Sequence, residues 1–181
     1  MGDRNRASAR PVEGWAGDLE RLWAPHRLAY ITDDDGDRSA ADEGCPFCSI
    51  PTVSDEDGLV VARGESVYVV LNKHPYNPGH VMVLPYRHVA GIEELTSEES
   101  GELMAFTQRA VVTIRSAAAP QGFNVGLNLG SVAGGSLADH LHQHVVPRWG
   151  GDANFITVLA GTKVIPQLLT DTRRILAAAW E

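Results

Sequence analysis

The chain has 181 residues, a formal net charge of −8 and an apolar fraction of 44%. This length is enough for one domain with a substantial core, and the negative charge argues against a broad nucleic-acid-binding surface. Two cysteines, no signal peptide and no long apolar run indicate a soluble cytoplasmic protein that does not insert into a membrane.

Residues 1–43 are expected to form an extension ahead of the main domain, which takes up residues 44–181. The first fourteen residues are polar or small and are typical of a mobile terminus. Trp15, Trp23 and Tyr30 are too apolar for a solvated arm. We therefore expect part of the extension to pack on the domain or on a second subunit.

Cys45-Pro46-Phe47-Cys48 has the spacing of half a zinc site or of a redox pair. No βαβ pattern surrounds it, which argues against thioredoxin-like chemistry. Two reduced cysteines packed as small hydrophobic side chains are the structural alternative.

Three strands are expected next, at residues 59–63, 66–71 and 79–85, with Gly64-Glu65 as a tight turn between the first two. Residues 96–118 form the clearest helix. Thr96 and Glu99 match a capping box, and the helix carries one apolar stripe, made of Leu103, Phe106, Ala110 and Ile114. This stripe predicts that the helix covers one face of a sheet.

Residues 122–129 alternate in polarity, so Phe123 and its alternate neighbours face the helix while Asn124 and Asn128 face the other way. A last strand at 155–160 and a C-terminal helix from Pro166 and Gln167 to Trp180 complete the chain. The pattern predicts an α+β fold: a mainly antiparallel five-stranded sheet with a long helix on one face and a C-terminal helix.

His140, His142 and His144 recur at every second residue. In an extended strand they would share one face, with the rings roughly 7 Å apart. Histidine serves as nucleophile, base, donor or metal ligand near neutral pH, so a metal site is one interpretation. The small-residue loop at 130–136 precedes them, and its backbone N–H groups could hold an anion. Together these features suggest phosphoryl or nucleotidyl transfer.

The segment His140-Leu141-His142-Gln143-His144-Val145-Val146 resembles the histidine-triad family pattern of alternating histidines followed by two apolar residues. The turn at 72–81 and the pair Cys45 and Cys48 also resemble family features, in the family's order. The resemblance therefore spans about residues 45–149. It implies a homodimer or higher homo-oligomer in which two sheets join into one.

The resemblance implies that His142 attacks the α-phosphorus of a nucleotide and forms a nucleotidyl-histidine intermediate. His144 would bind phosphoryl or leaving-group oxygens, and His140 would orient the site or bind zinc. In zinc-bearing relatives the metal ligands correspond to Cys45, Cys48, His88 and His140.

The resemblance also implies substrate-binding positions. These are Phe47 and Ile50 for the base, Asn72 for the ribose, Lys73 and His80 beside the site, Asn128, Gly135 and Ser136 for the phosphates, and Trp149 for a second base.

Ser136 stands where many hydrolases of the family carry Gln, four residues before the first triad histidine. The shorter side chain leaves room for inorganic phosphate as the acceptor. With the segment from Trp23 to Arg27, this resembles the family's bacterial diadenosine tetraphosphate phosphorylases, which convert dinucleotide and phosphate to ATP and ADP. Magnesium often assists phosphoryl transfer, but no carboxylate cluster beside the triad calls for it.

Three alternatives stay open. A dinucleoside polyphosphate hydrolase or nucleoside phosphoramidase would use the same His142 intermediate. A non-enzymatic nucleotide-binding module would leave the intact triad without a purpose. Nucleotidylation of a sugar phosphate is less consistent with the sequence, because that branch typically has Gln where this chain has His144.

Overall fold

The structure is a computed structural model that describes residues 44–133, 137–152, 165 and 167–180. The chain divides into two units, residues 1–32 and 33–181, and every described residue belongs to the second. Several predicted features lie outside the described residues: the N-terminal extension, Gly135, Ser136, the strand at 155–160 and Pro166.

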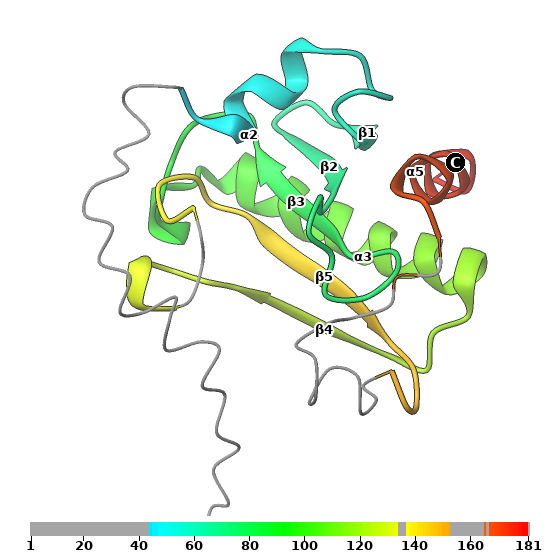
Figure 1. Cartoon of the computed structure of the whole chain (residues 1–181). Coiled ribbons are helices and arrows are strands. Elements are labelled where there is room, and N and C mark those ends of the chain that lie inside the picture. Colours follow the sequence, from blue (N-terminus) through cyan, green and yellow to red (C-terminus); the bar gives the residue numbers. More distant parts are fainter. Residues whose placement is uncertain (1–43, 134–136, 153–164, 166, 181) are drawn as a thin grey trace, which may run out of the picture. The chain divides into compact units, whose positions relative to one another are not determined.

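The described residues form one five-stranded sheet with the order β1-β2-β3-β5-β4, and every neighbouring pair is antiparallel (Figure 1). Its strands are β1 (Val60–Arg63), β2 (Val67–Leu71), β3 (Val81–Pro85), β4 (Gly122–Leu127) and β5 (Gln143–Arg148). β2 and β3 are buried along their whole length, because both faces of the sheet are covered there. The antiparallel sheet confirms the predicted fold class.

Helix α3 (Ser97–Ala118) runs across one face of the sheet (Figure 1). The predicted capping box is present: the Thr96 side chain accepts from the Glu99 N–H, and the Glu99 carboxylate accepts from the Thr96 N–H. Leu103, Ala110 and Ile114 are buried in the core, as the stripe predicted. The helix ends at Ala119, which adopts a left-handed conformation with φ 46°.

The C-terminal helix α5 (Leu169–Ala178) packs beside α3 and β1, and its Leu176 belongs to the same core. It begins two residues later than the expected Gln167, at a point where no side chain caps its first turn. The described residues contain no helix that is long and apolar enough to cross a membrane.

A second apolar cluster lies on the opposite face of the sheet, under helix α2 (Pro46–Ser49) and the 3-10 turn η1 (Ile50–Thr52). Phe47 packs there against side chains of β2 and β3, and the Tyr68 hydroxyl donates to the Phe47 carbonyl at 2.7 Å. The short segment carrying the two cysteines is thus fixed to the sheet by apolar burial. Two further 3-10 turns, η2 (Ile92–Glu94) and η3 (Ser131–Ala133), lie in the connections.

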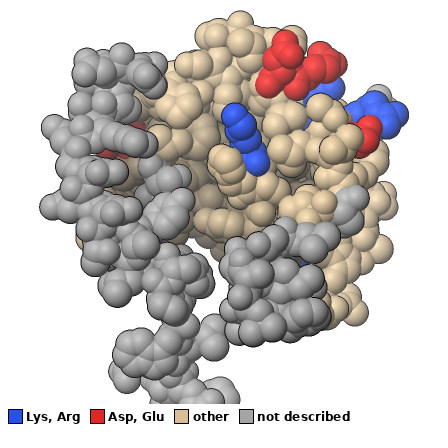
Figure 2. All heavy atoms as spheres, in the orientation of Figure 1, with Lys and Arg blue, Asp and Glu red and all other residues tan. Residues whose placement is uncertain are grey.

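Charged side chains are sparse on the face shown in Figure 2, and among the coloured residues Lys and Arg do not form a continuous patch. Two cations near the histidine and turn motifs form ion pairs: Arg87 with Glu99 and Arg148 with Asp152. Lys73 has no ion pair among the described residues.

Candidate active site

The triad lies on the sheet face opposite α3. Gln143 and Val145 point toward the helix, since the Gln143 amide donates to the Thr107 hydroxyl at 2.6 Å and Val145 lies in the core. Side chains at alternate positions therefore face the other way. Pairing of His144 with Met82 on one side and Gly126 on the other fixes its position in the sheet.

One expectation about the triad was wrong. Regular strand β5 begins only at Gln143, so His140 and His142 precede it, and the rings of His142 and His144 are 4.9 Å apart rather than roughly 7 Å. The Leu141 N–H donates to the carbonyl of Val89 at 2.6 Å, outside the strand ladder. The main chain at Leu141 thus pairs with the segment after β3 and not with a neighbouring strand.

His142 is held in one tautomer by the main chain. Its Nδ1 lies 2.8 Å from the carbonyl oxygen of His140, and a carbonyl can only accept, so Nδ1 carries the hydrogen. In the neutral ring Nε2 therefore keeps its lone pair. The residue is 6% exposed, and its ring contacts that of Phe47 at 5.0 Å.

His80 and His144 form a hydrogen-bonded pair on the triad side of the sheet. The Tyr76 N–H donates to Nδ1 of His80 at 3.1 Å, so the hydrogen of His80 is on Nε2. Nε2 in turn lies 3.0 Å from Nδ1 of His144 and donates to it. Burial, together with the neighbouring imidazoles, lowers the pKa of His80 to about 3 and that of His144 to about 4, so both rings are neutral near pH 7.

Because Nδ1 of His144 accepts a hydrogen bond from His80, the hydrogen of the neutral His144 ring is on Nε2. The Asn128 amide nitrogen lies 3.5 Å from that atom. As predicted, Asn128 thus stands on the triad face, at the end of β4. Two N–H donors side by side, with no acceptor between them, are suited to share an anionic oxygen.

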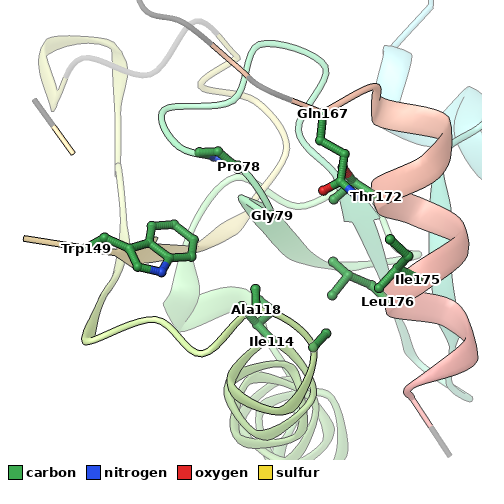
Figure 3. Close-up of a pocket in the computed structure, with 10 residues that line it drawn as sticks. Pro78, Gly79, Ile114, Ala118, Trp149, Gln167, Thr172, Ile175 and Leu176 are labelled. Atoms are coloured by element: carbon green, nitrogen blue, oxygen red, sulfur yellow. The ribbon is translucent and has the colours of Figure 1, made fainter.

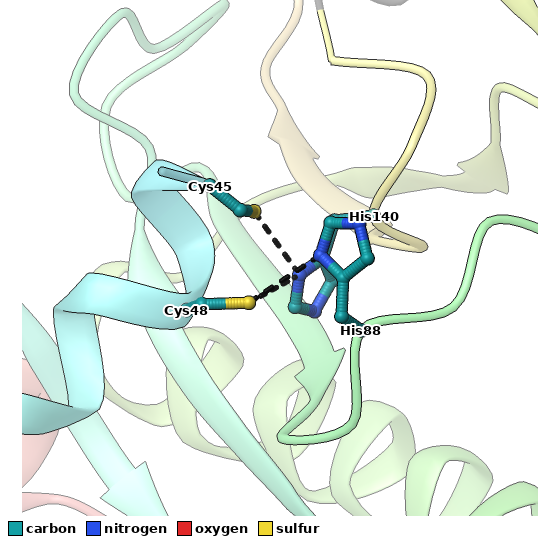
Figure 4. Close-up of side chains that lie close together, drawn as sticks. All are labelled: Cys45, Cys48, His88 and His140. Carbon is teal, nitrogen blue, oxygen red and sulfur yellow. Dashed lines mark hydrogen bonds between the residues drawn. The ribbon is translucent and has the colours of Figure 1, made fainter. Parts of the chain in front are cut away.

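Cys45, Cys48, His88 and His140 converge on one point beside the triad (Figure 4). Their ligand atoms all lie within 4.8 Å of one another, and the closest S···N separations are 3.3–3.5 Å. With Zn–S and Zn–N bonds of about 2.3 and 2.0 Å, the ligand atoms of a tetrahedral site lie roughly 3.3–3.8 Å apart. Both cysteines are free thiols in the structure.

The tautomer of His140 also suits a metal ligand. Its Nε2 lies 2.9 Å from the carbonyl oxygen of Pro85 and must donate to it, which leaves Nδ1 unprotonated and directed at the two sulfur atoms. A backbone acceptor behind a ligating histidine is the usual way in which proteins orient such a ring. The donor set and the tautomer therefore fit a closed zinc site.

Several other residues expected to bind substrate also make structural contacts. The ring of Phe47 lies beside that of His142, and both Phe47 and Ile50 pack into the cluster under α2, so much of their surface serves the core. The Asn72 side chain accepts from the His74 N–H at 2.8 Å and thus shapes the turn that follows β2. Lys73 is exposed on the same turn.

Trp149 lies away from the triad. It lines a pocket of about 340 Å³, together with Ile114 of α3, Leu176 of α5 and Gly79 (Figure 3). This pocket is on the α3 side of the sheet, so a base stacked on Trp149 would not lie over His142 of the same chain. Asp152 fixes this end of β5, because its carboxylate accepts from Arg148, Asn77 and the Trp149 N–H.

Sequence reasoning missed Tyr76. Its ring contacts those of His80 at 4.8 Å and His144 at 5.8 Å, yet the residue is 53% exposed. The available signal was its place between Pro75 and Pro78, in the turn that leads to His80. An aromatic residue in a proline-rich turn was read as part of the turn and not as part of the site.

Comparison with known proteins agrees with this architecture. The HIT domain family matches residues 54–151. The AP-4-A phosphorylase of Mycobacterium tuberculosis is 61% identical over 170 residues, which cover 92% of this chain and 87% of that protein. A zinc-bound histidine triad family protein from Mycobacterium smegmatis superposes with a TM-score of 0.60 at 26% identity, covering 76% of this chain and 94% of the other.

A histidine triad nucleotide-binding protein from Sulfolobus tokodaii gives a TM-score of 0.61 at 25% identity, covering 75% of this chain and 91% of its own. The chain therefore belongs to the histidine triad (HIT) family.

Proposed function

We propose that the protein is a diadenosine tetraphosphate phosphorylase, a nucleotidyltransferase that converts the dinucleotide and inorganic phosphate to ATP and ADP. Its similarity to the M. tuberculosis AP-4-A phosphorylase over nearly the whole chain supports the substrate. The observation that carries the chemistry is the pair of fixed tautomers, with a lone pair on Nε2 of His142 beside an N–H on Nε2 of His144.

In the first step, Nε2 of His142 attacks the α-phosphorus. The N–P bond forms as the anhydride P–O bond breaks, and ATP leaves with the electron pair of that bond. His144 and Asn128 donate to phosphoryl oxygens as their negative charge shifts. Since His142 keeps its other hydrogen bonded to the His140 carbonyl, the positive charge that develops on the ring is partly offset by that oxygen.

In the second step, an oxygen of inorganic phosphate attacks the same phosphorus. The N–P bond breaks, its electrons return to Nε2 of His142, and ADP is released. Gly135 and Ser136 are proposed to hold the phosphates through their backbone, with the short Ser136 side chain leaving space for the acceptor. Lys73 adds positive charge at the rim, Ile50 and Phe47 border the base, and Asn72 reaches the ribose.

Trp149 is proposed to contact the second base only in an assembly that brings its pocket to a neighbouring triad. The exposed edge of β4, where Val125 is 49% exposed, supports a homodimer with a continuous sheet, as the resemblance implies. Free thiols support a location in the cytoplasm. Neither a nucleic-acid polymer nor a membrane is expected as a partner.

Cys45, Cys48, His88 and His140 are proposed to hold a structural zinc ion. The ion would tie helix α2 to the start of the triad and supply no step of the reaction. His140 is accordingly a ligand and a source of the orienting carbonyl. It does not touch the reacting phosphorus.

The test is to incubate the protein with diadenosine tetraphosphate with and without phosphate and to separate the nucleotides. ADP and ATP that appear only when phosphate is added support phosphorolysis. AMP and ATP formed without phosphate would assign a hydrolase instead. His142→Ala should abolish turnover, and if this variant turned over normally the nucleophile would be misassigned.

A further inference from the structure

The aromatic rings on the triad face form a row. Ring contacts join Phe47 to His142 at 5.0 Å, His142 to His144 at 4.9 Å, and His144 to Tyr76 at 5.8 Å. Phe47 and Tyr76 thus stand at opposite ends, and Tyr76 is the end beside the ring that donates to the phosphates. Phe47 is buried, whereas Tyr76 is 53% exposed.

Tyr76 is held more rigidly than an exposed side chain usually is. Its N–H is bonded to His80, its ring packs against two imidazoles, and Pro75 restricts the backbone immediately before it. The next residue, Asn77, is buried and donates to the Pro147 carbonyl. The tyrosine side chain therefore loses little conformational entropy when a ligand binds to it.

The hydroxyl of Tyr76 has no hydrogen-bond partner among the described residues. A phenol is both donor and acceptor, and the ring that carries this hydroxyl lies 5.8 Å from the ring of His144, which forms with Asn128 a donor pair that suits an anionic oxygen. The exposed tyrosine extends this row of donors away from His142. A chain of several phosphates could therefore contact His144, Asn128 and Tyr76 in turn.

We propose that Tyr76 binds the leaving half of the substrate, its hydroxyl donating to the phosphate chain of the departing nucleotide and then to the incoming phosphate. This inference rests on the proposed function, which places the reacting phosphorus at His142. In-line displacement puts the leaving oxygen on the side opposite the nucleophile. Because His144 stands between His142 and Tyr76 in the row of ring contacts, the proposal places the rest of the phosphate chain beside His144 and Tyr76.

The experiment compares two substrates that share the adenylyl half, diadenosine tetraphosphate and adenosine 5′-phosphoramidate, whose leaving group is only ammonia. Tyr76→Phe removes one oxygen and keeps the ring that packs on His144. The ratio of kcat/KM for the tetraphosphate to kcat/KM for the phosphoramidate should fall about 10- to 100-fold, the loss typical of a hydrogen bond to a charged acceptor. Tyr86→Phe, the same change at a ring stacked on Tyr68, should leave the ratio unaltered.

Inhibition by products gives a second measurement. The inhibition constant of ATP should rise in Tyr76→Phe, while that of AMP, which fills only the adenylyl half, should rise less. If the phenylalanine variant lowered both kcat/KM values equally, or neither, Tyr76 would only support His144 and the inference would be overturned. Wild-type protein that turned over neither substrate would instead remove the proposed function, and the inference with it.

Discussion

His80 and His144 are joined by a hydrogen bond of 3.0 Å between Nε2 of the first and Nδ1 of the second. Because the other nitrogen of His80 accepts from the backbone of the turn at Tyr76, the donor order runs in one direction only. A main-chain amide therefore decides which nitrogen of His144 carries the hydrogen. The relationship links the turn between β2 and β3 to the chemistry on β5.

Replacing His80 should reduce catalysis without preventing nucleotide binding. His80→Leu removes the donor to His144, so Nε2 of His144 loses its fixed hydrogen, and we expect kcat to fall roughly 100-fold, as when one acid–base group is lost. His80→Gln keeps an N–H near the same place, so its kcat should fall only about tenfold. Steady-state phosphorolysis measures both, and similar melting temperatures would exclude a folding defect. Equal kcat values in the two variants would contradict the assigned donor role.

Stability should fall as the pH drops below about 6.5. The pKa values of His80 and His144 are lowered to about 3 and about 4 by burial, whereas both are about 6.5 in an unfolded chain. Between these values only the unfolded state takes up the protons. Each ring thus lowers the free energy of unfolding by up to about 1.4 kcal/mol for every pH unit below about 6.5.

Urea unfolding between pH 7.5 and 5.5 measures this slope. His80→Gln should have the shallower slope, since it lacks one of the two rings, and the metal ligands are common to both proteins. Identical slopes would mean that His80 is not held neutral in the folded state.

The metal cluster should contribute directly to stability. His88→Ala removes an exposed ligand, which does not disturb the core, and we expect it to lose bound zinc and about 10 °C of melting temperature. His74→Ala, a change at another exposed histidine, should do neither. Metal analysis and calorimetry of the same samples provide the check. Wild-type protein that contained no zinc and was unaffected by a chelator would rule the site out.

Glu102 of α3 should stabilise the hairpin between β1 and β2. Its carboxylate accepts from the N–H groups of Glu65, Ser66 and Val67 at 2.6–3.2 Å. Burial alone would raise the pKa of this carboxyl, but the three donors together outweigh it and the pKa is lowered. Glu102→Gln should therefore cost about 1–3 kcal/mol of unfolding free energy. Glu65→Gln is the exposed control, and equal unfolding free energies in the two variants would refute the role.

Much of the fold was predictable because its signals are local. The capping box at Thr96 and the apolar stripe through Leu103 and Ile114 define α3. Alternation along β4 placed Asn128 on the triad face before any pairing was known. These patterns depend on period and on capping chemistry, both of which the sequence carries directly.

The spacing of the triad rings and the role of Tyr76 depend on contacts between distant segments. Leu141, just before β5, bonds to the carbonyl of Val89, and nothing in the sequence around either residue predicts this contact. Tyr76 meets His144 across 68 positions of sequence. The location of Trp149 was equally inaccessible, because it depends on how α5 packs beside α3.

The contact that orients His142 uses the carbonyl of residue 140 and no part of its side chain. Substitution at position 140 should therefore remove a proposed metal ligand and still leave the proposed nucleophile with the same lone pair. The proposed reactivity and the proposed metal site therefore depend on different atoms of a single residue, the main-chain oxygen in one case and the imidazole ring in the other.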